Sequence, residues 1–233
     1  MHLSHPYGVF HQFGKRCGAA LAIITLAAGL SVGAAGADPL RLVALGDSLT
    51  QGYGLPADDG FVPQLQDWLT QNGHDVIVIN AGVSGDTTAG GLARLDWTLA
   101  EPVDAMLVTL GGNDLLRGVD PAASRANLDA ILARLQDEGI PAMLAGMPAP
   151  GNYGPEFRDA FERMYPDLAQ EYDVPLVPNF MQPMTDKADA GASFADLMQD
   201  DHIHPNADGV ALIVEGIGPD IAAFLETVTA ATP

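Results

Sequence analysis

From residue 40 onward, short apolar runs alternate with longer segments in which apolar residues recur with helical periodicity. The apolar runs are rich in Val, Ile and Leu and are too uniformly apolar for strands that expose one face to water, so they predict a sheet that is covered on both faces. The predicted strands are residues 40–45, 76–79, 105–110, 142–145 and 175–177, and the predicted helices are residues 61–71, 88–100, 121–138, 155–171 and 207–227.

Strands that alternate with helices in this way predict parallel βαβ units. The fold class is therefore α/β, a three-layer α/β/α sandwich with a five-stranded parallel sheet. In such a sheet the ligands bind beyond the carboxyl ends of the strands, so the residues that follow each strand are the candidates for function. Polar or glycine-rich clusters follow the first three strands and precede the last helix: Gly46-Asp47-Ser48, Ser84-Gly85-Asp86, Gly111-Gly112-Asn113-Asp114 and Asp200-Asp201-His202-Ile203-His204.

The first 37 residues have the pattern of an export signal. Lys15 and Arg16 precede an apolar run over residues 17–32, and Ala35-Gly36-Ala37 is a small-residue cleavage site. The apolar run is shorter than the roughly 20 residues that a membrane-spanning helix needs, so cleavage is favoured over an uncleaved anchor. The sequence thus predicts a signal peptide at residues 1–37, one mature domain at residues 38–233, and a periplasmic or secreted protein without a stable membrane anchor.

The net charge and the cysteine content of the mature chain exclude some partners and some kinds of chemistry. Both basic residues of the signal are lost on cleavage and no acidic residue lies before Asp38, so the mature chain keeps 8 basic and 30 acidic residues, a net charge of −22. Such a field repels phosphate backbones and argues against a nucleic-acid partner. The single cysteine, Cys17, lies in the predicted signal, so the mature chain has no disulfide, cysteine nucleophile or thiolate-bound zinc.

A serine hydroxyl needs a neighbouring base before it can act as a nucleophile. Outside the predicted signal the histidines are His74, His202 and His204, and His74 precedes a strand, at the wrong end of the sheet. His204 has Asp201 three residues before it, a spacing that lets the carboxylate reach one imidazole nitrogen and leaves the other for Ser48. We therefore predict a catalytic triad of Ser48, His204 and Asp201, with His204 preferred over His202.

Acyl transfer also needs hydrogen-bond donors where the oxyanion forms. The backbone amides of Ser48 and Gly85 and the side-chain amide of Asn113 come from three loops at the same edge of the sheet, and we predict that they form the oxyanion hole. Each cluster also has a simpler interpretation, because Asp-Ser is a common helix N-cap and Asn-Asp a common turn. His202 and His204 lie beside two aspartates, but they are a weak candidate for a metal site because no third histidine is available at this edge. A dinucleotide-cofactor site is disfavoured because no G-x-G-x-x-G follows the first strand. We expect no metal and no cofactor.

Taken together and in order, these clusters resemble the conserved blocks of the SGNH hydrolases, also called the GDSL family. Ser48 matches the nucleophile, Gly85 and Asn113 the oxyanion residues, and Asp201 and His204 the final block. Further segments are similar to the bacterial periplasmic thioesterase I, arylesterase and lysophospholipase subgroup: Gly91-Leu92-Ala93-Arg94-Leu95, Leu116-Arg117-Gly118 and Asn152-Tyr153-Gly154.

The resemblance implies a flavodoxin-like sheet of order 2-1-3-4-5 and a monomeric serine hydrolase that cleaves acyl esters and thioesters. It also implies that the loop after the fourth strand shapes the acyl pocket, with Met147, Pro148 and Tyr153 as substrate-binding residues. Two alternatives remain open. One is a carbohydrate O-deacetylase on the same fold, and the other is a secreted lipid- or glycan-binding protein on an inactive hydrolase scaffold.

Overall fold

A five-stranded parallel sheet forms the centre of the protein, in the order β2-β1-β3-β4-β5. The computed structural model describes residues 38–231, so the predicted signal peptide lies outside the described residues. All five predicted strands are present, and the observed order confirms the flavodoxin-like topology. The strands are β1 (Leu40–Gly46), β2 (Val76–Gly82), β3 (Ala105–Thr109), β4 (Ala142–Ala145) and β5 (Leu176–Val177).

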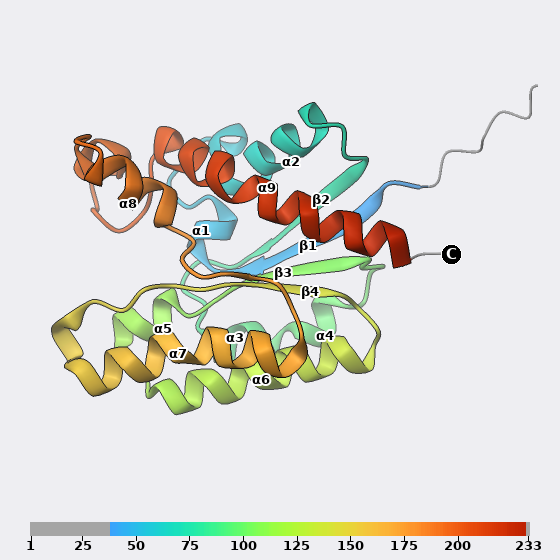
Figure 1. Ribbon diagram of the computed structural model, residues 1–233, viewed down its shortest axis with the longest axis horizontal. Helices are drawn as coiled ribbons and strands as arrows, with labels where there is room; N and C mark the ends of the chain where they lie inside the picture. Colours follow the sequence, from blue (N-terminus) through green and yellow to red (C-terminus); the bar gives the residue numbers. More distant parts are fainter. Residues whose placement is uncertain (1–37, 232–233) are drawn as a thin grey trace, which may run out of the picture. The chain divides into compact units, whose positions relative to one another are not determined.

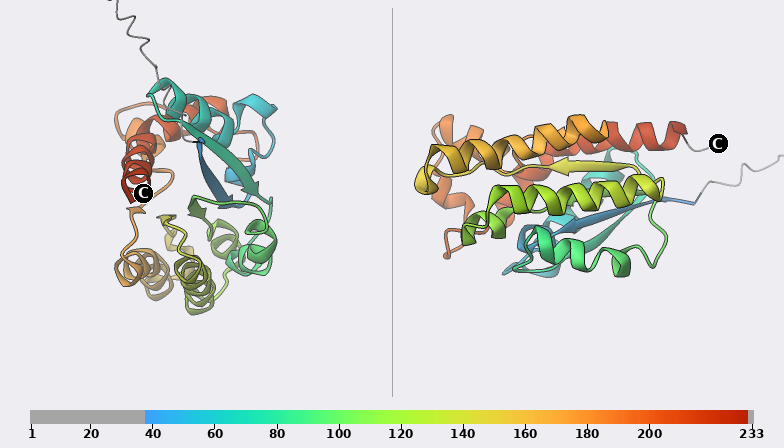
Figure 2. Two further views of the ribbon diagram at one scale, coloured as in Figure 1. Left: turned by 90° about the vertical axis from the view of Figure 1, so that its right-hand side faces the viewer. Right: turned by 90° about the horizontal axis from the view of Figure 1, so that it is seen from below.

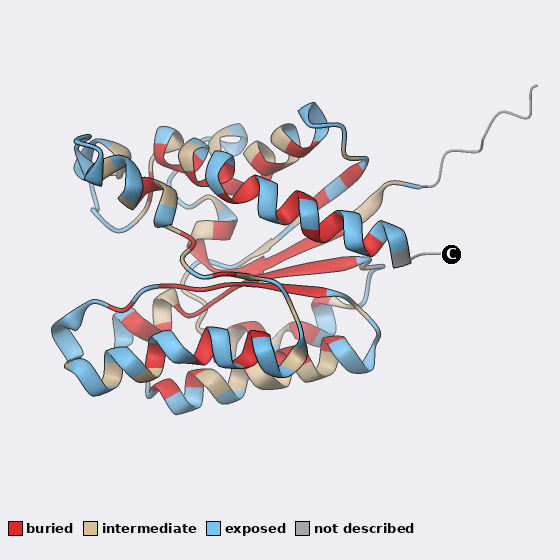
Figure 3. Ribbon diagram, in the orientation of Figure 1, coloured by how far each residue is buried: buried red, intermediate tan, exposed pale blue. Residues whose placement is uncertain are grey.

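Burial of the strands explains their uniform apolar sequences. Every residue of β3 and β4 is buried, and so are the last five residues of β1, because helices cover both faces of these strands (Figure 3). The edge strand β2 instead begins with Val76 buried, Ile77 exposed and Val78 buried. The core therefore lies along the central strands, as expected for a parallel sheet between two helical layers.

Two layers of helices enclose the sheet (Figures 1 and 2). One layer is formed by α1 (Ser48–Gln51), α2 (Phe61–Gln71), α8 (Gln182–Asp189) and α9 (Ala207–Ala231). The other contains α3 (Thr88–Ala93), α4 (Leu95–Thr98), α5 (Gly112–Arg117), α6 (Pro121–Asp137) and α7 (Pro155–Tyr172). The three-layer α/β/α sandwich is thus confirmed, and no helix in the described part of the chain is long and apolar enough to cross a membrane. Three short 3-10 turns complete the elements: η1 (Ala57–Asp59), η2 (Gly151–Tyr153) and η3 (Phe194–Leu197).

One predicted helix is divided in the structure. Residues 88–100 were expected to form a single helix, but they form α3 and α4 with Arg94 between them at φ −105° and ψ 6°. The Arg94 side chain turns inward to Asp86 and to the carbonyl of Gly46. This tertiary contact favours the break, which the local sequence does not reveal.

The carboxyl ends of the three strands that carry the candidate residues lie in register. Gly46 at the end of β1 pairs with Gly82 of β2 and with Thr109 of β3. The loops after these strands therefore start at the same level, which brings the predicted clusters to one edge of the sheet.

Candidate active site

Ser48 is the first residue of α1, and only Asp47 separates it from the end of β1. The Asp47 side chain caps this helix by accepting a hydrogen bond from the Leu49 amide at 3.0 Å. The turn passes so close to β2 that a β-carbon at Gly82 would lie 2.3 Å from the Gln51 backbone nitrogen. Glycine at position 82 thus allows the close approach of α1, which holds the largely buried Ser48 at the edge of the sheet.

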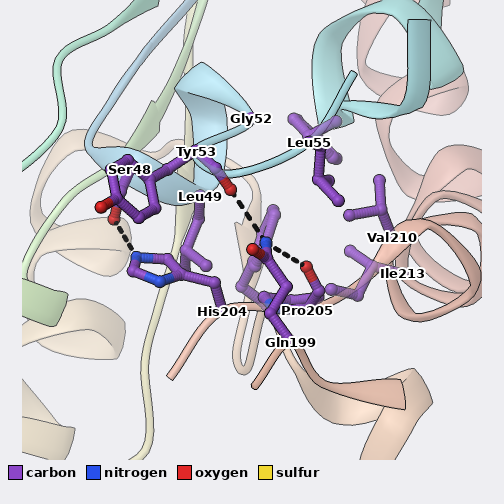
Figure 4. Close-up of a pocket in the computed structure, with 12 residues that line it drawn as sticks. Ser48, Leu49, Gly52, Tyr53, Leu55, Gln199, His204, Pro205, Val210 and Ile213 are labelled. Carbon is purple, nitrogen blue, oxygen red and sulfur yellow. Dashed lines mark hydrogen bonds between the residues drawn. The ribbon is translucent and has the colours of Figure 1, made fainter. Parts of the chain in front are cut away.

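His204 and Asp201 reach Ser48 from the loop before α9. The Nδ1 atom of His204 lies 2.6 Å from Oδ2 of Asp201. Its Nε2 atom lies 2.8 Å from Oγ of Ser48 (Figure 4). Oδ1 of Asp201 also accepts hydrogen bonds from the backbone amides of Ile203 (2.9 Å) and His204 (3.0 Å). The structure therefore brings the three predicted side chains together in the order carboxylate, imidazole, hydroxyl.

The two histidines that the sequence analysis set aside lie elsewhere. His202 is exposed and has a left-handed backbone, with φ 55°. His74 lies between α2 and β2, at the start of the strand and not at its carboxyl end. In the described residues, no group of three or more His, Cys, Asp or Glu side chains has the arrangement of a metal site.

Hydrogen bonds to Asp201 favour the ionised form of its carboxyl. The hydrogen bond from the His204 side chain, helped by the two backbone amides, holds the pKa of the Asp201 carboxyl well below its ordinary value. An ionised carboxylate can only accept, so the bond between them requires the hydrogen on Nδ1 of His204, and a neutral imidazole in this tautomer has Nε2 as the acceptor that faces Ser48. Burial has the opposite effect on Asp47, whose pKa it raises.

The three predicted oxyanion donors come from separate segments at this edge. The Ser48 amide belongs to the first turn of α1, where backbone N–H groups lack an intrahelical acceptor. Gly85 lies in a turn closed by the Asp86 amide and the Val83 carbonyl at 3.0 Å, and its φ of +85° favours glycine. Asn113 lies in α5 and uses its Nδ2 atom to donate to Oδ2 of Asp47 at 3.2 Å, which leaves the second amide hydrogen for a ligand.

Charged side chains behind the edge link these segments. Arg94 donates from Nε to Asp86 at 2.6 Å and from Nη2 to the Gly46 carbonyl at 2.9 Å, which ties the Gly85 turn to the end of β1. Both side chains of this ion pair are less than one fifth exposed. The helical pattern of residues 88–100 places Arg94 within a helix and gives no sign of this link.

The fully buried Asp114 forms a second link. Its carboxylate accepts from the Thr88 amide (2.8 Å), the Thr88 hydroxyl (2.6 Å) and the Ser124 hydroxyl (2.8 Å). These contacts tie α5, which carries Asn113, to the start of α3 and to α6. The same buried carboxylate, together with Asp47, adds to the effect of burial in raising the pKa of the Tyr165 phenol, which donates to the Leu110 carbonyl at 2.9 Å.

The loop expected to bind substrate lies against α5. Met147 is buried, and its Cε atom would contact a β-carbon at Gly112. Pro148 is exposed, and Tyr153 is about half exposed, with its hydroxyl 3.3 Å from the Leu116 carbonyl. The loop is therefore next to the helix that carries Asn113, but binding by these three residues stays a prediction.

A small cavity of about 10 Å³ lies beside Ser48, on the side of α2 and α9 and not on the side of α5 (Figure 4). Sequence reasoning did not anticipate it. Tyr53 and Gln199 line it, and the Tyr53 ring lies 4.8 Å from the imidazole of His204. An aromatic residue five positions after Ser48 is too weak a sequence signal to predict that Tyr53 lies in the site. A single glutamine in a polar loop gives no such signal. Its other lining residues include Leu55, Phe61, Phe180, Val210 and Ile213.

Residues 44–212 match the model of the GDSL-like lipase/acylhydrolase family, and the chain belongs to this family. It is 38% identical to the esterase TesA of Pseudomonas aeruginosa, over 79% of this chain and 89% of the relative. It is 39% identical to thioesterase 1/protease 1/lysophospholipase L1 of Escherichia coli K12, over 80% of this chain and 84% of the relative. The crystal structure of AlinE4, an SGNH-hydrolase family esterase, is 42% identical, with a TM-score of 0.65 and coverage of 81% of this chain and 98% of that one. The predicted family is confirmed, and with it the class of enzyme, a hydrolase of acyl esters.

Proposed function

We propose that Ser48, His204 and Asp201 are the catalytic triad and that the enzyme works through an acyl-enzyme on Ser48. The observation that carries the proposal is the continuous pair of hydrogen bonds, 2.6 Å from Asp201 to His204 and 2.8 Å from His204 to Ser48. Nucleophile, base and orienting carboxylate in this order are what acyl transfer requires.

In the first step, Nε2 of His204 takes the Ser48 proton while Oγ forms a bond to the acyl carbon. The carbonyl π electrons move to the oxygen, and the resulting oxyanion accepts hydrogen bonds from the Ser48 and Gly85 amides and from Asn113. Collapse of this intermediate breaks the bond to the leaving group, which receives the proton from His204. Water then repeats the sequence on the acyl-enzyme and releases the acid. Each oxyanion donor contributes on the order of 3 kcal/mol to the barrier reduction.

The proposed substrates are acyl esters and thioesters with an apolar acyl group. The support comes from the names of the relatives, esterase and thioesterase 1/lysophospholipase L1, and from the apolar side chains near Ser48. Met147, Pro148 and Tyr153 are proposed to contact the substrate from the loop beside α5. Carbohydrate O-deacetylation uses the same machinery, so acetylated sugars belong in the substrate panel with acyl-CoA, aryl esters and lysophospholipid.

We also propose that the enzyme is exported, that its mature chain begins at Asp38, and that it is a monomer. Export and cleavage are supported by the sequence pattern of residues 1–37 described above, and the monomeric state is what the family resemblance implies. Mass spectrometry of the exported protein measures the mature N-terminus, and light scattering on the purified protein measures its oligomeric state.

The decisive experiment compares Ser48→Ala with wild type on a short p-nitrophenyl ester. The variant is expected to lose esterase activity and to keep its circular dichroism spectrum, because alanine removes only the hydroxyl. Wild-type protein should also gain one covalent phosphonate on Ser48 when treated with an activated phosphonate, as seen by mass spectrometry. Ser193→Ala, at an exposed serine before η3, is the control and should retain full activity. Full activity in Ser48→Ala would overturn the proposal. Hydrolysis of the ester by the wild type would exclude the alternative of an inactive binding protein.

A further inference from the structure

The side chain of Gln199 connects the two segments that carry Ser48 and His204. Its Nε2 atom donates to the Tyr53 carbonyl at 2.8 Å and to the Pro205 carbonyl at 2.9 Å (Figure 4). Tyr53 follows α1, and its amide donates to the Ser48 carbonyl at 3.1 Å. Pro205 directly follows His204. One amide group therefore holds a residue next to the base and a residue bonded to the nucleophile.

The backbone of Gln199 forms hydrogen bonds within the loop that carries His204. Its amide donates to the His204 carbonyl at 2.8 Å, and its carbonyl accepts from the His202 amide at 3.0 Å. A β-bridge between Met198 and Pro205 closes the same loop. Because these contacts use backbone atoms, the loop can keep its own conformation when the Gln199 side chain is changed.

The neighbouring segment leaves room for the side chain of Gln199. Gly54 has φ +77°, and a β-carbon there would lie 2.2 Å from Oε1 of Gln199. A residue with a side chain at position 54 would push the amide out of its place. The contact thus depends on two residues from segments that are far apart in the sequence.

We propose that Gln199 is a positioning residue for the catalytic base, which keeps Nε2 of His204 within hydrogen-bonding distance of Oγ of Ser48. This inference rests on the triad proposed above. Asp201 cannot perform this task, because it lies in the same loop as His204 and orients the imidazole only relative to that loop. Gln199 sets the position of the whole loop relative to α1. A shift of about 1 Å between reacting groups costs roughly 100-fold in rate.

The first test is Gln199→Met, which removes both donors at nearly constant size and adds no charge. We expect kcat for a p-nitrophenyl ester to fall about 10- to 100-fold with little change in KM. The rate of phosphonate inactivation should fall in parallel, because it also depends on the activation of Ser48. The matched control is Gln66→Met, since Gln66 bridges backbone groups of Val76 and Val78 (2.9 and 2.8 Å) at the start of β2, away from the site. Its kcat should stay at the wild-type value.

A spectroscopic readout separates positioning from loss of loop structure. The downfield proton NMR signal of the Nδ1–H of His204 reports the bond to Asp201, which lies inside the loop. We expect this signal to remain in Gln199→Met while kcat falls. Loss of the signal would mean that the loop itself has unfolded and would overturn the positioning role.

A second pair of variants tests the same contact without changing Gln199. Gly54→Ala displaces the Gln199 amide, whereas Gly73→Ala carries the same strain at φ +85° with no atom within 4 Å of the new β-carbon. We expect Gly54→Ala to lower kcat as Gln199→Met does, and Gly73→Ala to retain it. This pair decides the matter if Gln199→Met does not fold. If Gln199→Met and Gly54→Ala both keep the wild-type kcat while Ser48→Ala is inactive, the positioning role is refuted and the triad stands. Activity in Ser48→Ala would instead refute the triad.

Discussion

Replacing Asp201 with asparagine converts one carboxylate oxygen into an amide nitrogen and leaves the rest of the loop unchanged. Oδ1 of Asp201 accepts from the Ile203 and His204 amides, and the asparagine oxygen can keep both contacts. The new NH₂ group then faces Nδ1 of His204, where the carboxylate oxygen now lies at 2.6 Å. The variant should therefore fold normally and differ only in what it presents to the imidazole.

The expected cost follows from the tautomer of His204. An NH₂ donor facing Nδ1 makes that nitrogen the acceptor and moves the hydrogen to Nε2, the atom 2.8 Å from Oγ of Ser48. A protonated Nε2 cannot take the serine proton, and this wrong tautomer costs about 10⁴-fold in kcat. At about 1.36 kcal/mol for each tenfold change, the barrier rises by roughly 5.4 kcal/mol.

The assay is steady-state hydrolysis of a p-nitrophenyl ester, with Asp200→Asn as the matched control. Asp200 is the exposed neighbour of Asp201, and its variant removes the same charge from the same loop. We expect Asp200→Asn to stay within about twofold of wild type, since an exposed charge contributes little. If the two variants have similar activity, or if Asp200→Asn is the more damaged, the tautomer argument and the assignment of Asp201 are wrong.

Two further predictions concern stability. Thr88→Val removes the hydroxyl that donates to the buried Asp114 carboxylate at 2.6 Å. It should lower the free energy of unfolding by about 1.5–3 kcal/mol, measured by urea titration, since a hydrogen bond to a charged group has this value. An unchanged urea midpoint would contradict the role given to this contact. The pKa of Asp201 is held below its ordinary value of 3.8, so the stabilisation from its ionised form is present above about pH 4 and is lost as pH falls through the lowered native pKa. The stability difference between wild type and Asp201→Asn should thus be largest near neutral pH and shrink in acid, and a difference that grows below pH 4 would refute the assigned sign.

Much of this protein follows from local sequence patterns. Uniform apolar runs predict buried parallel strands, and the segments between them predict the covering helices, because burial on both faces leaves no room for polar alternation. The spacing from Asp201 to His204 also predicts their pairing, since both lie in one short loop. The strand register places the Ser48 turn at the carboxyl edge of the sheet, and the loop before α9 reaches the same edge, where His204 contacts Ser48.

Other features depend on contacts between distant segments. The break at Arg94 reflects an inward contact with Asp86 and the Gly46 carbonyl, and helical periodicity carries no trace of it. Short helices such as α1 and α5 span one or two turns, too few for a periodic pattern to appear.

The clearest case is Gln199, whose side chain reaches a carbonyl 146 residues away in the sequence. A backbone carbonyl is present at every residue, so the acceptor leaves no mark on the sequence, and a glutamine before an Asp-Asp pair reads as an ordinary polar loop residue. The sequence by itself determined the fold and the family, and it predicted the chemical groups of the site. Only the tertiary structure decided which side of Ser48 holds the cavity and which contacts join the His204 loop to the segment after Ser48, because both depend on distances between segments that no local pattern encodes.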